Sequence, residues 1–172
     1  MAPRPFVPYP HPCLEGVADP VSSVTSETLA IWDEMLGAMY AMPGVGLAAP
    51  QLGIGLRLAV LDCSDTQDQA VRLANPELIA LAEEMRIGQE GSPNLPGLWE
   101  QVTRPAWAEV RYLDETGADV TRRFDDLWSA SVQHQIDHLN GKLFFDHLSP
   151  LKRKRLLEKH RKAQRKRARN GA

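Results

Sequence analysis

The chain has 172 residues, of which 43% are hydrophobic and 24% are charged, and these values are ordinary for a folded globular protein. It has no apolar run of about eighteen residues and only two cysteines, Cys13 and Cys63, which excludes a membrane-spanning helix and a disulfide framework. The net charge of −2 conceals a division, because residues 152–169 hold eleven basic residues and one acid. We therefore expect one acidic domain over residues 1–150 and a basic C-terminal helix or tail over 151–172.

The first part of the chain predicts an arm followed by a helix. Residues 3–20 contain six prolines, which remove backbone hydrogen-bond donors and favour an extended arm over a helix. Ser26 is expected to cap a helix that ends at Pro43-Gly44. The apolar residues of this helix recur at helical spacing and predict a buried stripe: Leu29, Trp32, Leu36 and Met39 or Tyr40.

The middle of the chain predicts short strands. Residues 56–62 are expected to form a strand, and Asn75-Pro76 marks a turn. Residues 77–88 favour a helix by the spacing of their apolar side chains, although strand pairing could override that preference. Two further strands, 109–113 and 120–124, are joined by a turn-forming segment and predict a hairpin.

A helix over Leu127 to Leu139 carries two histidines, His134 and His138. Residues four apart project from one face of a helix, so these imidazoles could bind one metal ion. The spacing is that of the zinc hydrolase helix, in which a glutamate after the first histidine is the general base, but Gln135 stands there. The alternative is two ordinary core or surface histidines.

Three segments, taken together, identify the chain as a relative of a known family. They are Gly44-Val45-Gly46-Leu47-Ala48-Ala49-Pro50-Gln51, Glu90-Gly91-Ser92-Pro93-Asn94-Leu95-Pro96-Gly97 and Gln133-His134-Gln135-Ile136-Asp137-His138. In this order they resemble the signature motifs of the peptide deformylases, Gly-φ-Gly-φ-Ala-Ala-x-Gln, Glu-Gly-Cys-φ-Ser and Gln-His-Glu-φ-Asp-His, where φ is apolar. The resemblance covers about residues 5–150. It implies an α+β fold with mixed and antiparallel sheets around the central helix that bears His134 and His138.

The resemblance also implies a reaction, the removal of the formyl group from N-formylmethionine of nascent peptides with a divalent metal, Fe²⁺ or Zn²⁺. Three positions depart from it. The metal-binding cysteine is Ser92, a poor ligand because its hydroxyl has a high pKa. Pro93 has no N–H to offer the oxyanion, and Gln135 cannot accept a proton as the glutamate would.

The binding residues that the resemblance implies are retained. Gln51 stands where the family stabilises the oxyanion, and Val45, Gly46 and Leu47 stand where it pairs with the substrate backbone. The methionine pocket would be formed by Leu127, Ala130, Ser131 and His134. Core packing is the alternative role for Leu127 and Ala130.

The leading hypothesis is a divergent deformylase-like protein with little or no deformylase activity that binds a nascent peptide or protein N-terminus in the cytoplasm. It would hold no metal, or one divalent metal at His134 and His138 with Ser92 at the third position. A first alternative is an active metal-dependent deformylase or amide hydrolase with an unusual metal shell. A reaction with Ser92 as nucleophile lacks an orienting acid.

A last alternative is a ribosome- or RNA-binding module that uses the basic residues 152–169. The competing interpretation is a solvated helix face, and no membrane partner is expected. Trp99, Trp107 and Trp128 are not interleaved with these charges, so the sequence predicts no stacking platform for bases.

Overall fold

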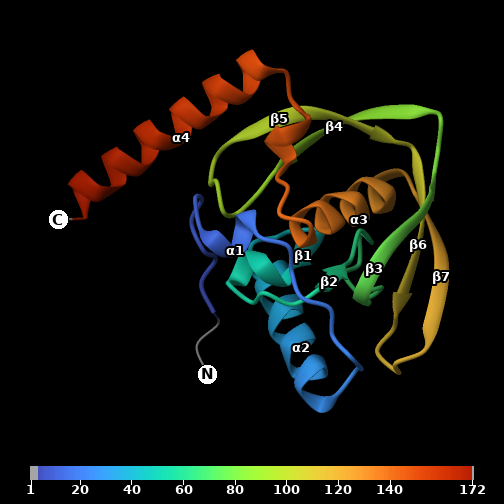
Figure 1. Ribbon diagram of the computed structural model, residues 1–172. Helices are drawn as coiled ribbons and strands as arrows, with labels where there is room; N and C mark the ends of the chain where they lie inside the picture. The colour runs from blue at the N-terminus through green and yellow to red at the C-terminus, as the bar shows by residue number, and fades with distance from the viewer. Residues whose placement is uncertain (1–3, 172) are drawn as a thin grey trace.

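The computed structural model describes residues 4–171, and the chain folds as α+β with two antiparallel sheets (Figure 1). Its helices are α1 (Pro12–Glu15), α2 (Ser26–Ala41), α3 (Asp126–Leu139) and α4 (Pro150–Asn170), with 3-10 turns η1 (Ala49–Leu52) and η2 (Phe144–His147). Its strands are β1 (Gly46–Ala48), β2 (Leu58–Leu61), β3 (Val71–Leu81), β4 (Met85–Gly91), β5 (Trp99–Pro105), β6 (Trp107–Leu113) and β7 (Asp119–Asp125).

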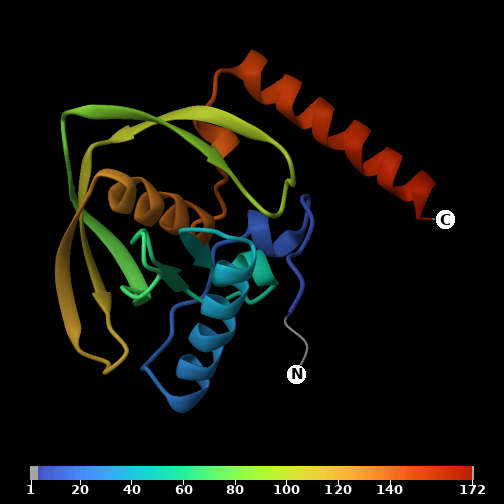
Figure 2. The same cartoon turned by 180° about the vertical axis from the view of Figure 1, so that it is seen from behind.

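The larger sheet has the order β1-β2-β3-β6-β7, and β4 and β5 form a separate hairpin. All of these strand pairs are antiparallel, and β1 is an edge strand whose one partner strand among residues 4–171 is β2. In Figures 1 and 2 the β4–β5 hairpin arches over α3, whose other side faces the larger sheet. Helix α3 is therefore enclosed by the two sheets.

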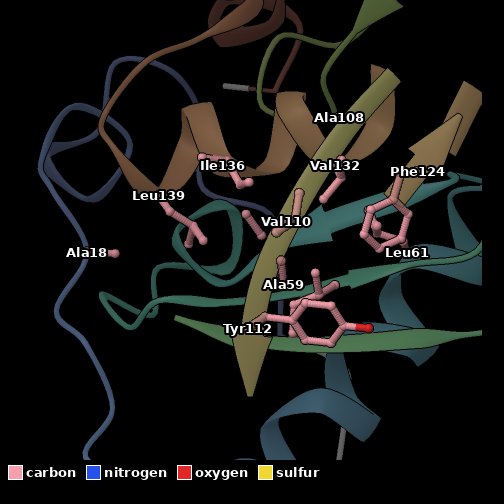
Figure 3. Close-up of a cluster of buried hydrophobic side chains, with 12 residues drawn as sticks. Ala18, Ala59, Leu61, Ala108, Val110, Tyr112, Phe124, Val132, Ile136 and Leu139 are labelled. Atoms are coloured by element: carbon pink, nitrogen blue, oxygen red, sulfur yellow. The ribbon is translucent and has the colours of Figure 1, made fainter. Parts of the chain in front are cut away.

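The sequence of α3 explains this position. Val132, Ile136 and Leu139 recur at helical spacing and are buried against the larger sheet. Figure 3 shows them beside Ala108 and Val110 of β6. A different face of the helix carries His134 and His138, which puts both imidazoles on the side away from this cluster.

Two further clusters complete the core. The first joins α2 to β1 and β2 through buried residues that include Trp32, Met35 and Met39. The second joins η2 and the hairpin to α4, and it contains Phe144, Phe145 and Leu156. Phe144 and Phe145 are core residues, as expected, whereas Leu29 of the predicted stripe of α2 is 38% exposed.

Several local predictions were wrong. The proline-rich arm is not extended throughout, because it contains α1. His11 Nδ1 accepts a hydrogen bond from Cys13 N at the start of this helix, and Pro12 is tolerated in its first turn. Thr25, not Ser26, caps α2, since its hydroxyl accepts the N–H of Thr28 at 3.4 Å.

Residues 77–88 are the end of β3 and the start of β4, not a helix. Pairing of β3 with β6 and of β4 with β5 satisfies the backbone, which outweighs the helical spacing. Asn75-Pro76 is not a turn between elements but lies within β3, at a register shift against β6. Asn75 has φ +50°, and its side chain binds the backbone N–H and C=O of Val21.

Helix α4 runs away from the body, as both views show (Figures 1 and 2). Leu156 anchors it, and the predicted partner Leu157 is only partly buried. His160 is also buried, and its Nε2 donates to the carbonyl of Tyr9 at 2.7 Å. Gln164 donates to the same carbonyl, so polar contacts hold α4 as well as apolar ones. Within residues 4–171 no helix is long and apolar enough to cross a membrane.

Candidate active site

A groove of about 550 Å³ lies between the start of β1, the β4–β5 hairpin and α3. It brings together most of the site residues predicted from sequence: Val45, Gly46, Gln51, Ser92, Leu127, Ala130, Ser131, His134 and Gln135. Leu47 and His138 do not line it, and both are buried behind it. Leu127 is 53% exposed in the groove, which rules out simple core packing for that residue.

One wall of the groove is the free edge of β1. Val45 O accepts the N–H of Asp62 after β2, while Ala48 N donates to the side-chain oxygen of Gln51 at 2.9 Å. Backbone groups alternate in direction along a strand, so the N–H and C=O of Gly46 face away from β2. An extended peptide could pair with this edge.

Gly46 also packs closely on α3. A Cβ built on it would lie 2.4 Å from Ser131 Oγ and 2.6 Å from Gln135 Nε2, so only glycine fits without a shift. Ser131 Oγ donates to Val45 O at 3.2 Å and ties the edge to the helix. The Gln135 amide is therefore held in the groove, and its Oε1 is buried without a hydrogen-bond partner among residues 4–171.

Gln51, the candidate oxyanion donor, is engaged inside the protein. Its Nε2 donates to Ser92 Oγ at 3.3 Å and to Asn94 Oδ1 at 3.0 Å. Ser92 Oγ in turn donates to Asn94 Oδ1 at 2.9 Å. All three side chains are buried.

Asn94 was missed by the sequence reasoning. Its Nδ2 donates to the carbonyls of Val7 and Gln51, so it connects the N-terminal arm to the second motif. The signal available was a polar residue between Pro93 and Leu95 in a loop with few other hydrogen-bonding side chains.

A network of ion pairs and hydrogen bonds holds the His134 ring in place. Its Nδ1 lies 2.9 Å from Glu90 Oε2, and a carboxylate can only accept, so Nδ1 carries the proton. Arg104 Nη2 donates to the same Glu90 oxygen at 2.9 Å, and Nη1 donates to Asp137 at 2.9 Å. His147 Nε2 donates to Asp137 at 2.7 Å. The Glu90 carboxylate thereby fixes the orientation of the His134 ring.

Burial and neighbouring groups both shift the pKa values of side chains in this network. Burial raises the pKa of Glu90, but the bonds from His134 and Arg104 outweigh it and lower that pKa to about 2. Burial lowers the pKa of His138 well below its usual value, and the neighbouring His134 lowers it further. His138 is therefore a neutral imidazole at neutral pH.

The structure corrects one expectation about the basic tail. Trp99 is 60% exposed and lines a cavity of about 210 Å³ together with Lys152, Arg155 and Lys159 of α4. The sequence separates this indole from the basic residues by about fifty positions. The hairpin nevertheless brings them together, so an aromatic ring does stand beside the cations.

A family model described as polypeptide deformylase matches residues 3–154. The chain belongs to the polypeptide deformylase family. It is 43% identical over 157 residues to a peptide deformylase of Hydrogenovibrio crunogenus, covering 91% of this chain and 92% of that one.

Solved deformylase structures share the fold. The Legionella pneumophila structure is 36% identical with a TM-score of 0.90, over 98% of this chain and 99% of that chain. The Met-Ala-Ser-bound structure from Acinetobacter baumannii is 31% identical with a TM-score of 0.79, over 84% of this chain and 97% of that chain.

The deformylase family is metal-dependent, and a catalytic metal centre normally has three protein ligands. The ring centroids of His134 and His138 lie 4.9 Å apart. Neither nitrogen of His138 has a hydrogen-bond partner among residues 4–171. The third position offers only the neutral hydroxyl of Ser92, which is bonded to Gln51 and Asn94. Within those residues no group of three His, Cys, Asp or Glu side chains could hold a metal. The donor set does not fit a catalytic centre with three strong protein ligands.

Proposed function

We propose that this deformylase-family protein binds a nascent peptide or protein N-terminus in its groove and has little or no deformylase activity. The observation that carries the proposal is the bonding of the Gln51 amide. Its Nε2 is directed at Ser92 Oγ and Asn94 Oδ1, so the donor that the resemblance assigns to an oxyanion is engaged within the protein.

Two further groove positions, Pro93 and Gln135, also support low deformylase activity. Pro93 follows Ser92 and has no N–H, and losing one oxyanion donor typically costs about 10²–10³ in rate. Gln135 lines the groove at the position of the general base, and an amide does not accept a proton at neutral pH. General acid–base help is worth about 10²–10⁴. Such penalties need not add, but each lowers turnover.

The residues needed to bind a peptide, by contrast, are present in the groove. The free edge of β1 can accept backbone hydrogen bonds, and Leu127 and Ala130 line the groove beside it. The Acinetobacter baumannii deformylase has been solved bound to Met-Ala-Ser, and its fold matches this chain. Peptide binding needs neither a proton acceptor at Gln135 nor a third metal ligand.

Calorimetric titration with formyl-Met-Ala-Ser and Met-Ala-Ser tests the binding. The comparison is between Leu127→Arg, which puts a charge into the groove, and Leu151→Arg, an equally exposed leucine outside it. The proposal expects binding that Leu127→Arg weakens at least about tenfold, which is 1.4 kcal/mol, and that Leu151→Arg leaves unchanged. Absence of binding to both peptides would contradict it.

A second candidate function is RNA binding through α4, and the position of Trp99 favours it. Lys152, Arg155 and Lys159 can neutralise phosphates while the exposed indole stacks on a base. Titration with a single-stranded RNA oligonucleotide at several salt concentrations tests this function. Binding should fall with salt and with Trp99→Ala, and should persist in Lys142→Ala, a cation outside α4. Salt-independent binding, or none at low salt, would exclude it.

A further inference from the structure

Hydrogen-bond acceptors are grouped in the groove where α3 packs on Gly46 of β1. The Gln135 side chain lines the groove, and the residue is only 4% exposed. Its Oε1 has no hydrogen-bond partner in the part of the chain that the structure describes. His134 also lines the groove, and its Nδ1 carries the proton that binds Glu90, so Nε2 is left as an acceptor in the neutral ring. Adjacent residues of α3 therefore supply two side-chain acceptors.

His138 adds to this set from behind the groove. Its ring centroid lies 4.9 Å from that of His134, and both of its nitrogens are buried without a partner within residues 4–171. A neutral imidazole has one acceptor and one donor. A buried polar atom without a partner costs free energy, so Gln135 and His138 both favour a ligand that bonds to them.

The donors that a formyl oxygen would need at this end of the groove are engaged or missing. The Gln51 amide donates to Ser92 Oγ and Asn94 Oδ1. The Ser92 hydroxyl itself donates to Asn94 Oδ1. Pro93 lines the groove and has no N–H. The hydrogen-bonding capacity that remains is therefore mainly of the acceptor kind, which suits a ligand that donates.

The charges beside these acceptors favour a cation. Glu90 and Asp137 both pair with one guanidinium, that of Arg104, so this network has two carboxylates for one fixed positive charge. With neutral histidines the network carries a net negative charge. Arg86 also lines the groove, but it is paired with Asp126. A positively charged group bound beside the network is therefore attracted to it.

We propose that this end of the groove recognises a free N-terminal ammonium group, so that the protein selects peptides without a formyl group. The inference rests on the proposed peptide-binding function and adds the chemical state of the N-terminus. An ammonium group has three donors and one positive charge. Gln135 Oε1 and His134 Nε2 can accept two of these hydrogen bonds, and the carbonyl of Gly46 on the free edge of β1 is available for the third. Such a cation, unlike a catalytic metal, needs no third strong ligand.

Formylation would remove both advantages. A formylated α-nitrogen belongs to a neutral amide with a single N–H, so it can satisfy at most one of these acceptors. The formyl oxygen needs a donor, and the Gln51 amide is already bonded within the protein. Binding that leaves a buried acceptor or carbonyl without a partner is weakened by the lost hydration of that group.

Calorimetric titration of the full chain, with a chelator present, compares three peptides that share the methionine side chain. Met-Ala-Ser has the ammonium group, formyl-Met-Ala-Ser has a neutral amide, and desamino-Met-Ala-Ser has a hydrogen in place of the amino group. Near pH 7 the wild type should bind Met-Ala-Ser at least about tenfold more tightly than either of the others. The desamino peptide is the smallest of the three, so its weak binding would exclude a steric effect of the formyl group.

Gln135→Met tests the acceptor on α3. Methionine is similar in length to glutamine, and the Oε1 that it removes has no partner, so the variant should fold. It should bind Met-Ala-Ser about tenfold more weakly than the wild type does and leave the affinity for formyl-Met-Ala-Ser unchanged. The control is Gln101→Met, because Gln101 is an exposed glutamine of β5 outside the groove and should affect neither peptide.

The outcomes separate the ammonium site from the peptide-binding function. Equal binding of Met-Ala-Ser and the desamino peptide, tighter binding of the formyl peptide, or a preference that survives Gln135→Met would overturn the ammonium site while the peptide-binding function stands. Binding of none of the three peptides would overturn both. The comparison of the three peptides uses the wild type alone, so it decides the proposal even if Gln135→Met does not fold.

Discussion

The side-chain amide of Gln51 donates to the hydroxyl of Ser92 at 3.3 Å, across 41 residues of sequence. The same amide also donates to Asn94 Oδ1, and the three side chains form a closed, buried set. Where the family resemblance assigns one oxyanion donor and one metal ligand, this chain has two groups that satisfy each other. The three side chains therefore meet one another's hydrogen-bonding needs within the protein.

Metal binding should increase when Ser92 becomes a cysteine. A thiolate is a strong, soft ligand that would join His134 and His138, whereas the serine hydroxyl remains neutral. After incubation with zinc and removal of excess, elemental analysis should find about one zinc per Ser92→Cys chain. Wild type and Ser92→Ala should both hold much less. Equal zinc in all three proteins would show that position 92 does not limit metal binding.

Removing the buried cation between Glu90 and Asp137 should destabilise the fold. Arg104→Met leaves the partly buried carboxylates of Glu90 and Asp137 without their shared partner, and the cost should be about 3 kcal/mol of unfolding free energy. Urea denaturation followed by circular dichroism measures this change. The control is Arg111→Met, since Arg111 forms an exposed ion pair with Asp119 and should matter little. Similar midpoints for the two variants would contradict the buried network.

The contact between Tyr40 of α2 and Asp62 after β2 should make stability depend on pH. The Tyr40 hydroxyl donates to Asp62 at 2.7 Å. Burial, then this bond, raises the pKa of Tyr40 to about 12. Burial raises the pKa of Asp62, but bonds from Ser64 and Tyr40 outweigh it, so that pKa is lowered.

The sign follows from these directions. The lowered pKa of Asp62 stabilises the fold above its unfolded value of about 3.9, and the gain is lost as pH falls through the folded pKa. The raised pKa of Tyr40 gives stability that is full below about pH 10 and is lost as pH rises toward 12. Tyr40→Phe should therefore cost about 1 kcal/mol from pH 5 to 9, and the advantage of wild type over Asp62→Asn should shrink below pH 4. Advantages that do not vary between pH 3 and pH 7 would disprove the linkage.

The sequence was sufficient to predict secondary structure where the local pattern and the fold agree. The helix of His134 and His138 and the hairpin of β6 and β7 were predicted closely, because their periodicity is clear and their turns are short. It was insufficient at residues 77–88, where pairing with distant strands decides between helix and strand. Long-range pairing cannot be read from a window of a dozen residues.

The site shows the same limit. The motif positions identified the groove residues, but not that Asn94 would bind Gln51 or that Trp99 would stand beside Lys159. The open space beside Gly88 of β4 could not be predicted either, because a glycine in a strand does not reveal whether space or another part of the chain lies opposite it. These are tertiary relationships between segments far apart in the chain.

Formate release from formyl-Met-Ala-Ser tests the central claim most directly. The wild type and the variant Ser92→Cys/Pro93→Leu/Gln135→Glu should be assayed side by side after identical loading with Fe²⁺ or Zn²⁺. The account predicts that the wild type releases formate at least about 10³-fold more slowly than the variant, because the ligand, the oxyanion N–H and the base are restored together. Rapid turnover by the wild type, abolished by His134→Ala, would contradict it and would establish an active enzyme with an unusual metal shell.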